Sequence, residues 1–352
     1  MNIHEIYIKR AIQLAKNGLG NTYPNPIVGC VIVANNKIIG EGFTSPAGLN
    51  HAEVNAIENV KDKSLLKIAT LYVTLEPCSH FGKTPPCADL IIKNNIPTVV
   101  IGTMDTNTEV CGKGVQRLTS AGVNVILGTL EEQCITSNMR FFSVQEKKRP
   151  YIILKWAQTS DFYISPEETK GEPMPFWITN TISRQLVHKW RTEEHAILVG
   201  TQTVVSDNPQ LSARDWKGNN PIRLVLDGSL RTPKNLHLWD DSTPTIFFIS
   251  DKEPLPSEKF VQTSFVAIDF TLNIAEQIIA ELYRLKIQSV IIEGGKKTLQ
   301  SFIDSQLWDE ARIFTSTQNL GSGIKAPVLR NFKLTSQYQI ANDTVNLYHF
   351  CE

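Results

Sequence analysis

The sequence reads His51-Ala52-Glu53 and, further along, Glu76-Pro77-Cys78 with Cys87 nine residues later, and this stretch decides how the first half of the chain folds. One imidazole and two thiolates form a ligand set that suits Zn²⁺, and a site with three protein ligands keeps its fourth position open for water. An open position is typical of catalytic zinc. In zinc deaminases a Glu that is not a ligand moves the protons, and Glu53 fits that role. We therefore predict a catalytic zinc site held by His51, Cys78 and Cys87.

Length and composition bound the possibilities. A chain of 352 residues exceeds the usual size of one domain, so two domains are expected. A hydrophobic content of 41% and a charged content of 20% are typical of a soluble globular protein. Lys and Arg number 35, as do Asp and Glu, and no basic stripe is visible. These features argue against a protein that binds nucleic acid.

The first residues of the chain and the number of its cysteines indicate in which cellular compartment the protein works. Residues 1–5 lack a basic segment followed by an apolar one, and no run of about 18 apolar residues occurs. Six cysteines in a chain of this length do not suggest a disulfide framework, and a reducing compartment suits thiolates that bind metal. We therefore expect a cytoplasmic protein without a membrane partner.

The first half alternates between helical and strand patterns. Asn35-Asn36 tolerates the positive φ of a tight turn and predicts a hairpin between strands at Ile27–Val33 and Lys37–Gly42. A helix from His51 to about Asn59 places Glu53 in its first turn. We expect further helices at 4–17, 88–94 and 115–121 and strands at 70–75, 98–102 and 123–127. Pro77 is expected to open another helix, with Cys78 at its N-terminus.

The second half is expected to be a separate α/β domain. The alternation lapses between Met139 and Pro150, and Gln145–Pro150 is the best candidate for a linker. Beyond it, apolar runs predict strands at 151–157, 195–200, 222–227, 244–250, 289–293, 310–315 and 344–350, with helices between several of them. No internal repeat or low-complexity tract occurs.

The run from Thr74 to Cys87, together with Pro24-Asn25-Pro26-Ile27-Val28-Gly29, closely resembles the bifunctional deaminase-reductase family of bacterial riboflavin biosynthesis. The resemblance implies a cytidine-deaminase-like three-layer domain over residues 1–145 and a dihydrofolate-reductase-like domain over residues 146–352. It implies that the first domain removes the 2-amino group of a diaminopyrimidinone ribosyl phosphate with Zn²⁺. The second domain would then reduce the ribosyl group to ribityl with NADPH.

Three further residues are expected to bind the substrate of the first domain. Asn25 stands between two prolines, which hold it extended so that its amide can meet the edge of a ring. His80 and Lys83 lie in the loop between the two cysteines and suit the polar groups or the phosphate of the substrate. The resemblance supports all three. Thr44 departs from the family, which commonly has His at this position.

The strongest local signal of the second half is Ser289–Leu299, where an apolar strand runs into Gly294-Gly295 and a helical pattern follows. Backbone N–H groups at such a turn suit a phosphate. The pattern is not the G-x-G-x-x-G fingerprint, so a Rossmann fold is not indicated. The resemblance implies that NADPH is bound by Gln158, Trp177, Thr203, Asp207, Gly228, Gly295, Lys296, Lys297, Thr298, Leu299, Gln300 and Ser301. It implies that the reductase substrate is bound by Lys155, Arg191, Leu211, Arg214 and Glu293.

Three residues of the second half depart from the family pattern. Phe162 replaces a turn Gly after Asp161 and cannot adopt positive φ without strain. Pro175 replaces a Ser that faces the substrate, and Asn180 replaces the Ser after Trp177-Ile178-Thr179. These departures raise a further hypothesis, that the reductase domain is inactive.

Two other hypotheses are set beside the bifunctional one. The first is a zinc nucleoside or tRNA deaminase with an unrelated or inactive C-terminal domain, and the neutral charge argues against its RNA form. The second is a zinc-stabilised binding module without turnover. For the bifunctional enzyme we expect a small ribosylaminopyrimidine phosphate as substrate, no nucleic acid partner, and assembly into a homo-oligomer, a dimer or a tetramer.

Overall fold

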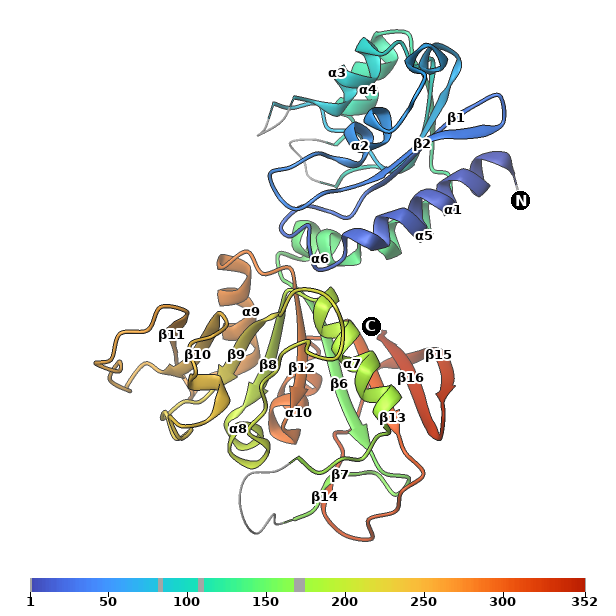
Figure 1. Cartoon of the computed structure of the whole chain (residues 1–352). Helices are drawn as coiled ribbons and strands as arrows, with labels where there is room; N and C mark the ends of the chain where they lie inside the picture. Colours follow the sequence, from blue (N-terminus) through green and yellow to red (C-terminus); the bar gives the residue numbers. More distant parts are fainter. Residues whose placement is uncertain (1, 82–84, 107–110, 168–174, 352) are drawn as a thin grey trace. The chain divides into compact units, whose positions relative to one another are not determined.

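The structure is a computed structural model that describes residues 2–81, 85–106, 111–167 and 175–351 (Figure 1). It divides into two compact units, Met1–Lys148 and Arg149–Glu352. The boundary expected after residue 145 falls inside a helix that runs to Lys147.

The first unit contains a five-stranded sheet with helices on both faces (Figure 1). Its strands are β1 (Gly29–Ala34), β2 (Lys37–Phe43), β3 (Thr70–Leu75), β4 (Thr98–Thr103) and β5 (Asn124–Leu127). Its helices are α1 (Ile3–Ala15), η1 (Lys16–Gly18), α2 (Ala52–Glu58), η2 (Lys63–Ile68), α3 (Cys87–Lys93), α4 (Lys113–Ser120), α5 (Glu131–Ser137) and α6 (Met139–Lys147).

Alternation along the strands sorts the side chains of the sheet between two cores. In β1, Val31 and Val33 pack against α1, whereas Ile32 packs in the core that contains Ala52 and Ala56 of α2. Helices α1 and α5 cover one face of the sheet, and α2, α3 and α4 cover the other. The predicted three-layer architecture is therefore confirmed.

The order of the sheet is β2-β1-β3-β4-β5. The predicted hairpin is present, with φ of 51° at Asn35 and 57° at Asn36. Strand β1 runs antiparallel to β3, so that Cys30 lies beside Val73. The N-terminal end of β1 and the C-terminal end of β3 consequently meet at one edge of the sheet, where the sequence places both Asn25 and Cys78.

The second unit contains a nine-stranded sheet in the order β11-β10-β9-β8-β12-β6-β13-β16-β15 and a two-stranded sheet of β7 and β14 (Figure 1). Its strands are β6 (Tyr151–Gln158), β7 (Tyr163–Ser165), β8 (Ala196–Gly200), β9 (Ile222–Leu226), β10 (Thr245–Ser250), β11 (Thr263–Ile268), β12 (Ser289–Gly294), β13 (Glu310–Thr315), β14 (Ile324–Lys325), β15 (Phe332–Ile340) and β16 (Asp343–Phe350). Its helices are α7 (Thr181–Glu193), α8 (Thr201–Asp207), η3 (His237–Trp239), α9 (Ile274–Arg284) and α10 (Lys296–Asp304).

The central strands of this sheet, from β11 to β13, are parallel, and β16 and β15 add an antiparallel edge. Helices α9 and α10 pack on one face through Ile278 and Phe302, and Val204 of α8 packs in the core of the other face. All seven predicted strands are present. The strands that the sequence did not predict are short, as β7 and β14 are, or lie at the sheet edges.

Two local predictions were wrong. Pro77 does not open a helix, because residues 76–79 continue from β3 as irregular chain that leads to the metal site. The next helix is α3, which was predicted at 88–94 and begins at Cys87, whose backbone N–H donates to Sγ of Cys78 at 3.3 Å. The lapse predicted after Met139 is also wrong, since α6 buries Phe141 and Phe142 there against the first core.

Candidate functional site

Helix α2 carries His51 as its N-cap and Glu53 in its first turn. The helix lies directly on β2 because two glycines there have no side chain. A Cβ at Gly40 would lie 2.4 Å from the carbonyl oxygen of Ala56, and one at Gly42 would lie 2.5 Å from that of Ala52. This close contact sets the start of α2 at the edge of the sheet where β1 begins.

The segment that carries Cys78 is held by the buried carboxylate of Glu76. Its Oε1 accepts from the backbone N–H of Gly114 at 2.9 Å, and its Oε2 accepts from Gly112 at 3.0 Å. Asp105 and Val115 donate at 3.3 and 3.2 Å. Because β3 ends one residue before Glu76, these bonds tie the end of the strand to the start of α4 and fix the direction of the chain toward Cys78.

The structure brings His51, Cys78 and Cys87 together, and their ligand atoms all lie within 4.8 Å of one another. Nδ1 of His51 lies 3.6 Å from Sγ of Cys78 and 3.4 Å from Sγ of Cys87. Zn–N bonds of about 2.0–2.1 Å and Zn–S bonds of about 2.3 Å in a tetrahedral site put nitrogen and sulfur about 3.6 Å apart. The three side chains therefore fit a zinc ion.

The charges at this site follow from burial and from the thiolate. The pKa of Cys78 is lowered to about 4, mainly by the hydrogen bond from the Cys87 thiol and also by His51. Glu53 is 4% exposed. Burial and the neighbouring Cys78 thiolate raise the pKa of Glu53 to about 7. A carboxyl group in this environment can both accept and release a proton near neutral pH.

The structure also places two of the other residues predicted for this site. Asn25 lies in the segment that enters β1, and His80 lies exposed in the loop after Cys78. Lys83 lies outside the described residues. Thr44 is buried and uses its hydroxyl within the chain, where it accepts from the N–H of Val28 at 3.0 Å.

The second unit holds a cavity of about 1730 Å³. Most of the residues predicted to bind NADPH or the reductase substrate line it: Lys155, Trp177, Arg191, Thr203, Asp207, Leu211, Arg214, Gly228, Glu293, Gly295, Lys296, Lys297, Thr298 and Leu299. The predicted residues Gln158, Gln300 and Ser301 do not line it. Gln158 accepts from the indole N–H of Trp156 at 2.9 Å, and Gln300 accepts from the N–H of Val328 at 3.0 Å.

The floor of the cavity contains a buried charge cluster. Arg191 donates to both oxygens of Glu293, at 3.0 and 2.7 Å, and Nζ of Lys155 lies 3.6 Å from Oε2 of Glu293. Burial alone would raise the pKa of Glu293, but the charges of Arg191 and Lys155 lower it to about 2. Burial lowers the pKa of Lys155, and Arg191 adds to that effect. One carboxylate thus pairs with both of these cations in the lining of the cavity.

The Gly-Gly turn predicted for phosphate binding opens α10, with Gly295 as its N-cap. Gly294 has a φ of 148°, which only glycine adopts readily, and the Gly294-Gly295 peptide is cis. A Cβ at Gly294 would lie 3.1 Å from Oγ1 of Thr203, and one at Gly200 would lie 2.6 Å from Oγ1 of Thr298. The absence of side chains lets the starts of α8 and α10 approach each other beside the cavity.

Phe162 adopts the positive φ that was expected to be strained at this position. Its φ is 66°, its N–H donates to the carbonyl of Thr159 at 3.0 Å, and its side chain is 59% exposed. The segment after it forms β7, whose Ile164 and Ser165 line the cavity. Phe162 therefore closes a turn here in a backbone region that favours glycine.

Replacing Phe162 by glycine is expected to stabilise the second unit by up to about 1 kcal/mol. A non-glycine residue in the left-handed region costs about 1–2 kcal/mol, and the greater conformational entropy of glycine in the unfolded chain offsets part of the gain. Urea unfolding of the full-length protein measures the difference. Phe176→Gly, at an exposed residue without positive φ, is the matched control and is expected to bring no gain.

Asn180 and Pro175 are the other two residues that depart from the family pattern. Asn180 caps α7: its Oδ1 accepts from the N–H of Ser183 at 2.9 Å, and its Nδ2 donates to Asp343 at 2.7 Å. It therefore replaces the family Ser with another good helix cap. Pro175 lines the cavity.

Sequence reasoning missed two polar residues of α7 that line the cavity. Arg184 and His188 precede Arg191 by seven and three residues and share its face of the helix. Arg184 lies 4.2 Å from the ring centroid of Trp177, and Nδ1 of His188 donates to the carbonyl of Ser212 at 2.9 Å. The helical spacing from Arg191 was the signal that would have found both.

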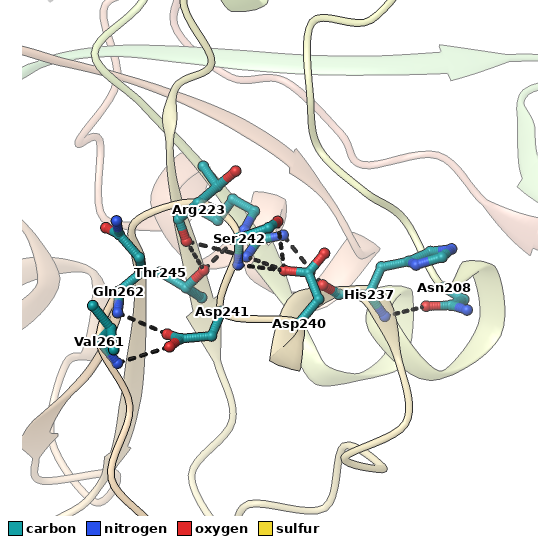
Figure 2. Close-up of polar contacts among 10 residues, drawn as sticks. Asn208, Arg223, His237, Asp240, Asp241, Ser242, Thr245, Val261 and Gln262 are labelled. Atoms are coloured by element: carbon teal, nitrogen blue, oxygen red, sulfur yellow. Dashed lines mark hydrogen bonds and ion pairs between the residues drawn. The ribbon is translucent and has the colours of Figure 1, made fainter.

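A polar network fixes the side of the cavity lined by Asn208 and His237 (Figure 2). Arg223, 2% exposed, donates to the carbonyl of His237 at 3.2 Å and to Asp240 at 2.8 Å. The N–H of His237 donates to Oδ1 of Asn208 at 2.8 Å. Figure 2 also shows Asp241 accepting from the N–H groups of Val261 and Gln262, each at 2.7 Å. The network joins the end of α8 to the connection between β9 and β10.

Asp207→Asn is expected to stabilise the second unit at pH 8 by about 1–2 kcal/mol and to bring no gain at pH 4. Burial raises the pKa of Asp207 to about 6. Because the folded-state pKa lies above the unfolded value, stability is fully present below about pH 4 and is lost as pH rises through about 6. Thermal unfolding of both proteins across this range measures the effect. Equal gains at both pH values would contradict it.

Among the residues that the structure describes, no helix combines the length and the apolar composition that a membrane span requires.

Comparisons with known proteins agree with both sites. Residues 1–103 match the cytidine and deoxycytidylate deaminase zinc-binding region, and residues 150–346 match the RibD C-terminal domain. The riboflavin biosynthesis protein RibD of Aquifex aeolicus is 38% identical over 92% of this chain and 89% of its own length. RibD of Actinobacillus pleuropneumoniae is 38% identical over 90% and 84%.

Solved structures are similar over nearly the whole chain. A diaminohydroxyphosphoribosylaminopyrimidine deaminase/5-amino-6-(5-phosphoribosylamino)uracil reductase of Thermotoga maritima matches with a TM-score of 0.88 and 38% identity over 99% of both chains. RibD of Acinetobacter baumannii matches with a TM-score of 0.85 and 32% identity over 98% of both chains. With a zinc-binding geometry in one unit and a reductase cavity in the other, the chain belongs to the RibD family of bifunctional, zinc- and NADPH-dependent deaminase-reductases of riboflavin biosynthesis.

Proposed function

We propose that this chain performs two consecutive steps on one ribosylaminopyrimidine phosphate. The first unit removes the 2-amino group of the diaminopyrimidinone ring as ammonia, and the second unit reduces the ribosyl side chain to ribityl with NADPH. The observation that carries the proposal is the convergence of His51, Cys78 and Cys87 beside the buried carboxylate of Glu53.

In the deamination, His51, Cys78 and Cys87 would hold zinc, which would supply a Lewis acid that makes a water more acidic. Glu53 takes one proton of the attacking water and gives it to the ring nitrogen as the water oxygen bonds to the ring carbon. Glu53 then takes the second proton of that oxygen and gives it to the amino nitrogen, whose bond to the ring carbon breaks as ammonia leaves. Asn25, His80 and Lys83 hold the ring and the phosphate.

In the reduction, NADPH would supply hydride to the ribosyl carbon in its open imine or aldehyde form, and the imine nitrogen or aldehyde oxygen would take up a proton. The cations of the cavity support this assignment. Arg191, Arg214 and Lys155 are cations of the cavity that suit the ribose phosphate, and Leu211 and Glu293 lie in the same lining and complete the proposed substrate site. The starts of α8 and α10, with Thr203 and residues 295–301, suit the phosphates of NADPH. Gln158, Trp177, Asp207 and Gly228 are proposed to bind other parts of the cofactor.

The test uses the purified full-length protein. We expect bound zinc, ammonia release from the diaminopyrimidinone phosphate, and NADPH oxidation with the deaminated product. Removing zinc with a chelator is expected to abolish ammonia release and to leave NADPH oxidation unchanged. A metal-free protein that still releases ammonia would overturn the first assignment. Deamination without NADPH oxidation would overturn the second and leave a single-function deaminase.

We further propose that the protein works in the cytoplasm as a homo-oligomer. Thiolates that bind metal need a reducing compartment. Strand β15 forms an edge of the nine-stranded sheet and leaves Phe332 and Leu334 48% and 47% exposed, and an apolar edge strand favours pairing with a second copy. Light scattering after size exclusion tests the assembly, and a monomer would contradict it.

A further inference from the structure

Asn138 occupies the N-cap position of α6 but does not cap that helix. An Asn at this position usually accepts a hydrogen bond from the first turn of its own helix. The side chain of Asn138, 2% exposed, binds Ile27 instead, 111 residues away in the sequence. Its Oδ1 accepts from the N–H of Ile27 at 2.9 Å, and its Nδ2 donates to the carbonyl of Ile27 at 2.8 Å.

This amide pairs with both backbone groups of one residue, as a neighbouring β-strand would. Ile27 precedes β1 by two residues and has no strand beside it in the sheet. Asn138 supplies the missing partner. Both bonds are buried, so loss of the amide leaves a buried donor and a buried acceptor to be satisfied by movement toward water.

The segment held in this way carries Asn25. The N–H of Asn25 donates to the carbonyl of Thr22 at 2.8 Å, and Oγ1 of Thr22 donates to the carbonyl of Asn25 at 3.1 Å. The next residue after Ile27 is held by Thr44, whose N–H donates to the carbonyl of Val28 at 3.0 Å. Within the described part of the chain, the side-chain amide of Asn25 has no partner, which leaves it available to a ligand.

We infer that Asn138 is a positioning residue of the deaminase: it holds Ile27 so that the amide of Asn25 stays at the edge of the sheet where the pyrimidine ring binds. The inference rests on the proposed role of Asn25. Asn138 acts on the binding of the ring and not on the metal, since its bonds go to the segment before β1 and to none of the three metal ligands.

The experiment compares Asn138→Ala, Asn25→Ala and the double variant in the full-length, zinc-loaded protein. Asn138→Ala is expected to raise KM for ammonia release about tenfold, with kcat within about twofold of the wild-type value. Zinc content and NADPH oxidation are expected to stay unchanged. Asn25→Ala is expected to raise KM similarly, and the double variant is expected to be no worse than Asn25→Ala, because both act through one contact.

Two further variants separate positioning from general stability. Asn138→Asp keeps an acceptor for the N–H of Ile27 but loses the donor, so its KM is expected to fall between those of the wild type and Asn138→Ala. Asn94→Ala is the matched control, because Nδ2 of Asn94 also donates to a backbone carbonyl, that of Leu90 at 2.8 Å, within the same unit. Its KM is expected to match that of the wild type. If Asn138→Ala does not fold, the KM of Asn138→Asp decides alone.

The outcomes that overturn the inference differ from those that overturn the proposed function. A wild-type KM in the Asn138 variants beside a raised KM in Asn25→Ala overturns the positioning role alone. Additive effects in the double variant, or loss of zinc and kcat together with the rise in KM, overturn it as well. A wild-type KM in Asn25→Ala overturns the proposed role of Asn25 and the inference with it.

Discussion

Glu53→Gln is expected to slow ammonia release by about 10²–10⁴-fold, the usual contribution of a positioned general acid and base. Glutamine keeps the shape and volume of the side chain but cannot take up or release a proton. Because Glu53 is buried at the start of α2 and is not one of the three metal ligands, zinc content is expected to stay unchanged. The measurement is kcat for ammonia release, with metal content determined on the same sample.

The chain offers two controls for this variant. Glu58→Gln changes an exposed residue at the end of the same helix and is expected to leave ammonia release unchanged. NADPH oxidation by the Glu53→Gln protein, supplied with the deaminated intermediate, is expected to match that of the wild type. Ammonia release above about one-tenth of the wild-type rate would contradict the proposed role, and so would loss of zinc.

Glu293→Gln is expected to destabilise the second unit by about 3–5 kcal/mol, because it leaves Arg191 and Lys155 as buried cations without a counter-charge. The side chains of Arg191 and Lys155 are only 11% and 15% exposed, so water screens their repulsion poorly. The further variant Glu293→Gln with Arg191→Gln is expected to regain part of the stability. Thermal unfolding of the second unit in the full-length protein measures both.

Ammonia release in the same samples reports on the first unit and is expected to survive heating as in the wild type. Glu281→Gln is the matched control, since it breaks an ion pair with Arg284, whose side chain is 65% exposed, and such pairs contribute at most about 1 kcal/mol. If Glu293→Gln is as stable as Glu281→Gln, the buried cluster does not hold the unit together as proposed.

Sequence patterns predicted the parts of the fold that depend on short-range chemistry. Asn35-Asn36 identified the hairpin because positive φ at both residues is a local property. His51, Cys78 and Cys87 identified the metal site because few residue types bind zinc. The seven predicted strands of the second unit were found because buried parallel strands are apolar throughout. The edge strand β15 was not predicted: its apolar residues alternate with polar ones, but its first six residues are exposed, so no buried apolar run marks it.

The contacts that position the site could not be predicted from the sequence because they join segments that are distant along the chain. Nothing near Asn138 in the sequence indicates that its amide binds Ile27. Nor does the sequence show that Cys78 receives its backbone hydrogen bond from Cys87 rather than from a helix of its own. Gln158 and Gln300 were assigned by resemblance alone, and the sequence did not indicate the hydrogen bonds that their side chains make to Trp156 and Val328.

The fit between α2 and β2 has a consequence for genetics. Any side chain at Gly40 or Gly42 would push the helix off the sheet and carry His51 and Glu53 with it. In a library of all single substitutions selected for growth without added riboflavin, inactive alleles should therefore cluster at these two codons as sharply as at the metal ligands. Substitutions under the face of α2 that packs on β2 should therefore abolish deamination as readily as substitutions of the metal ligands.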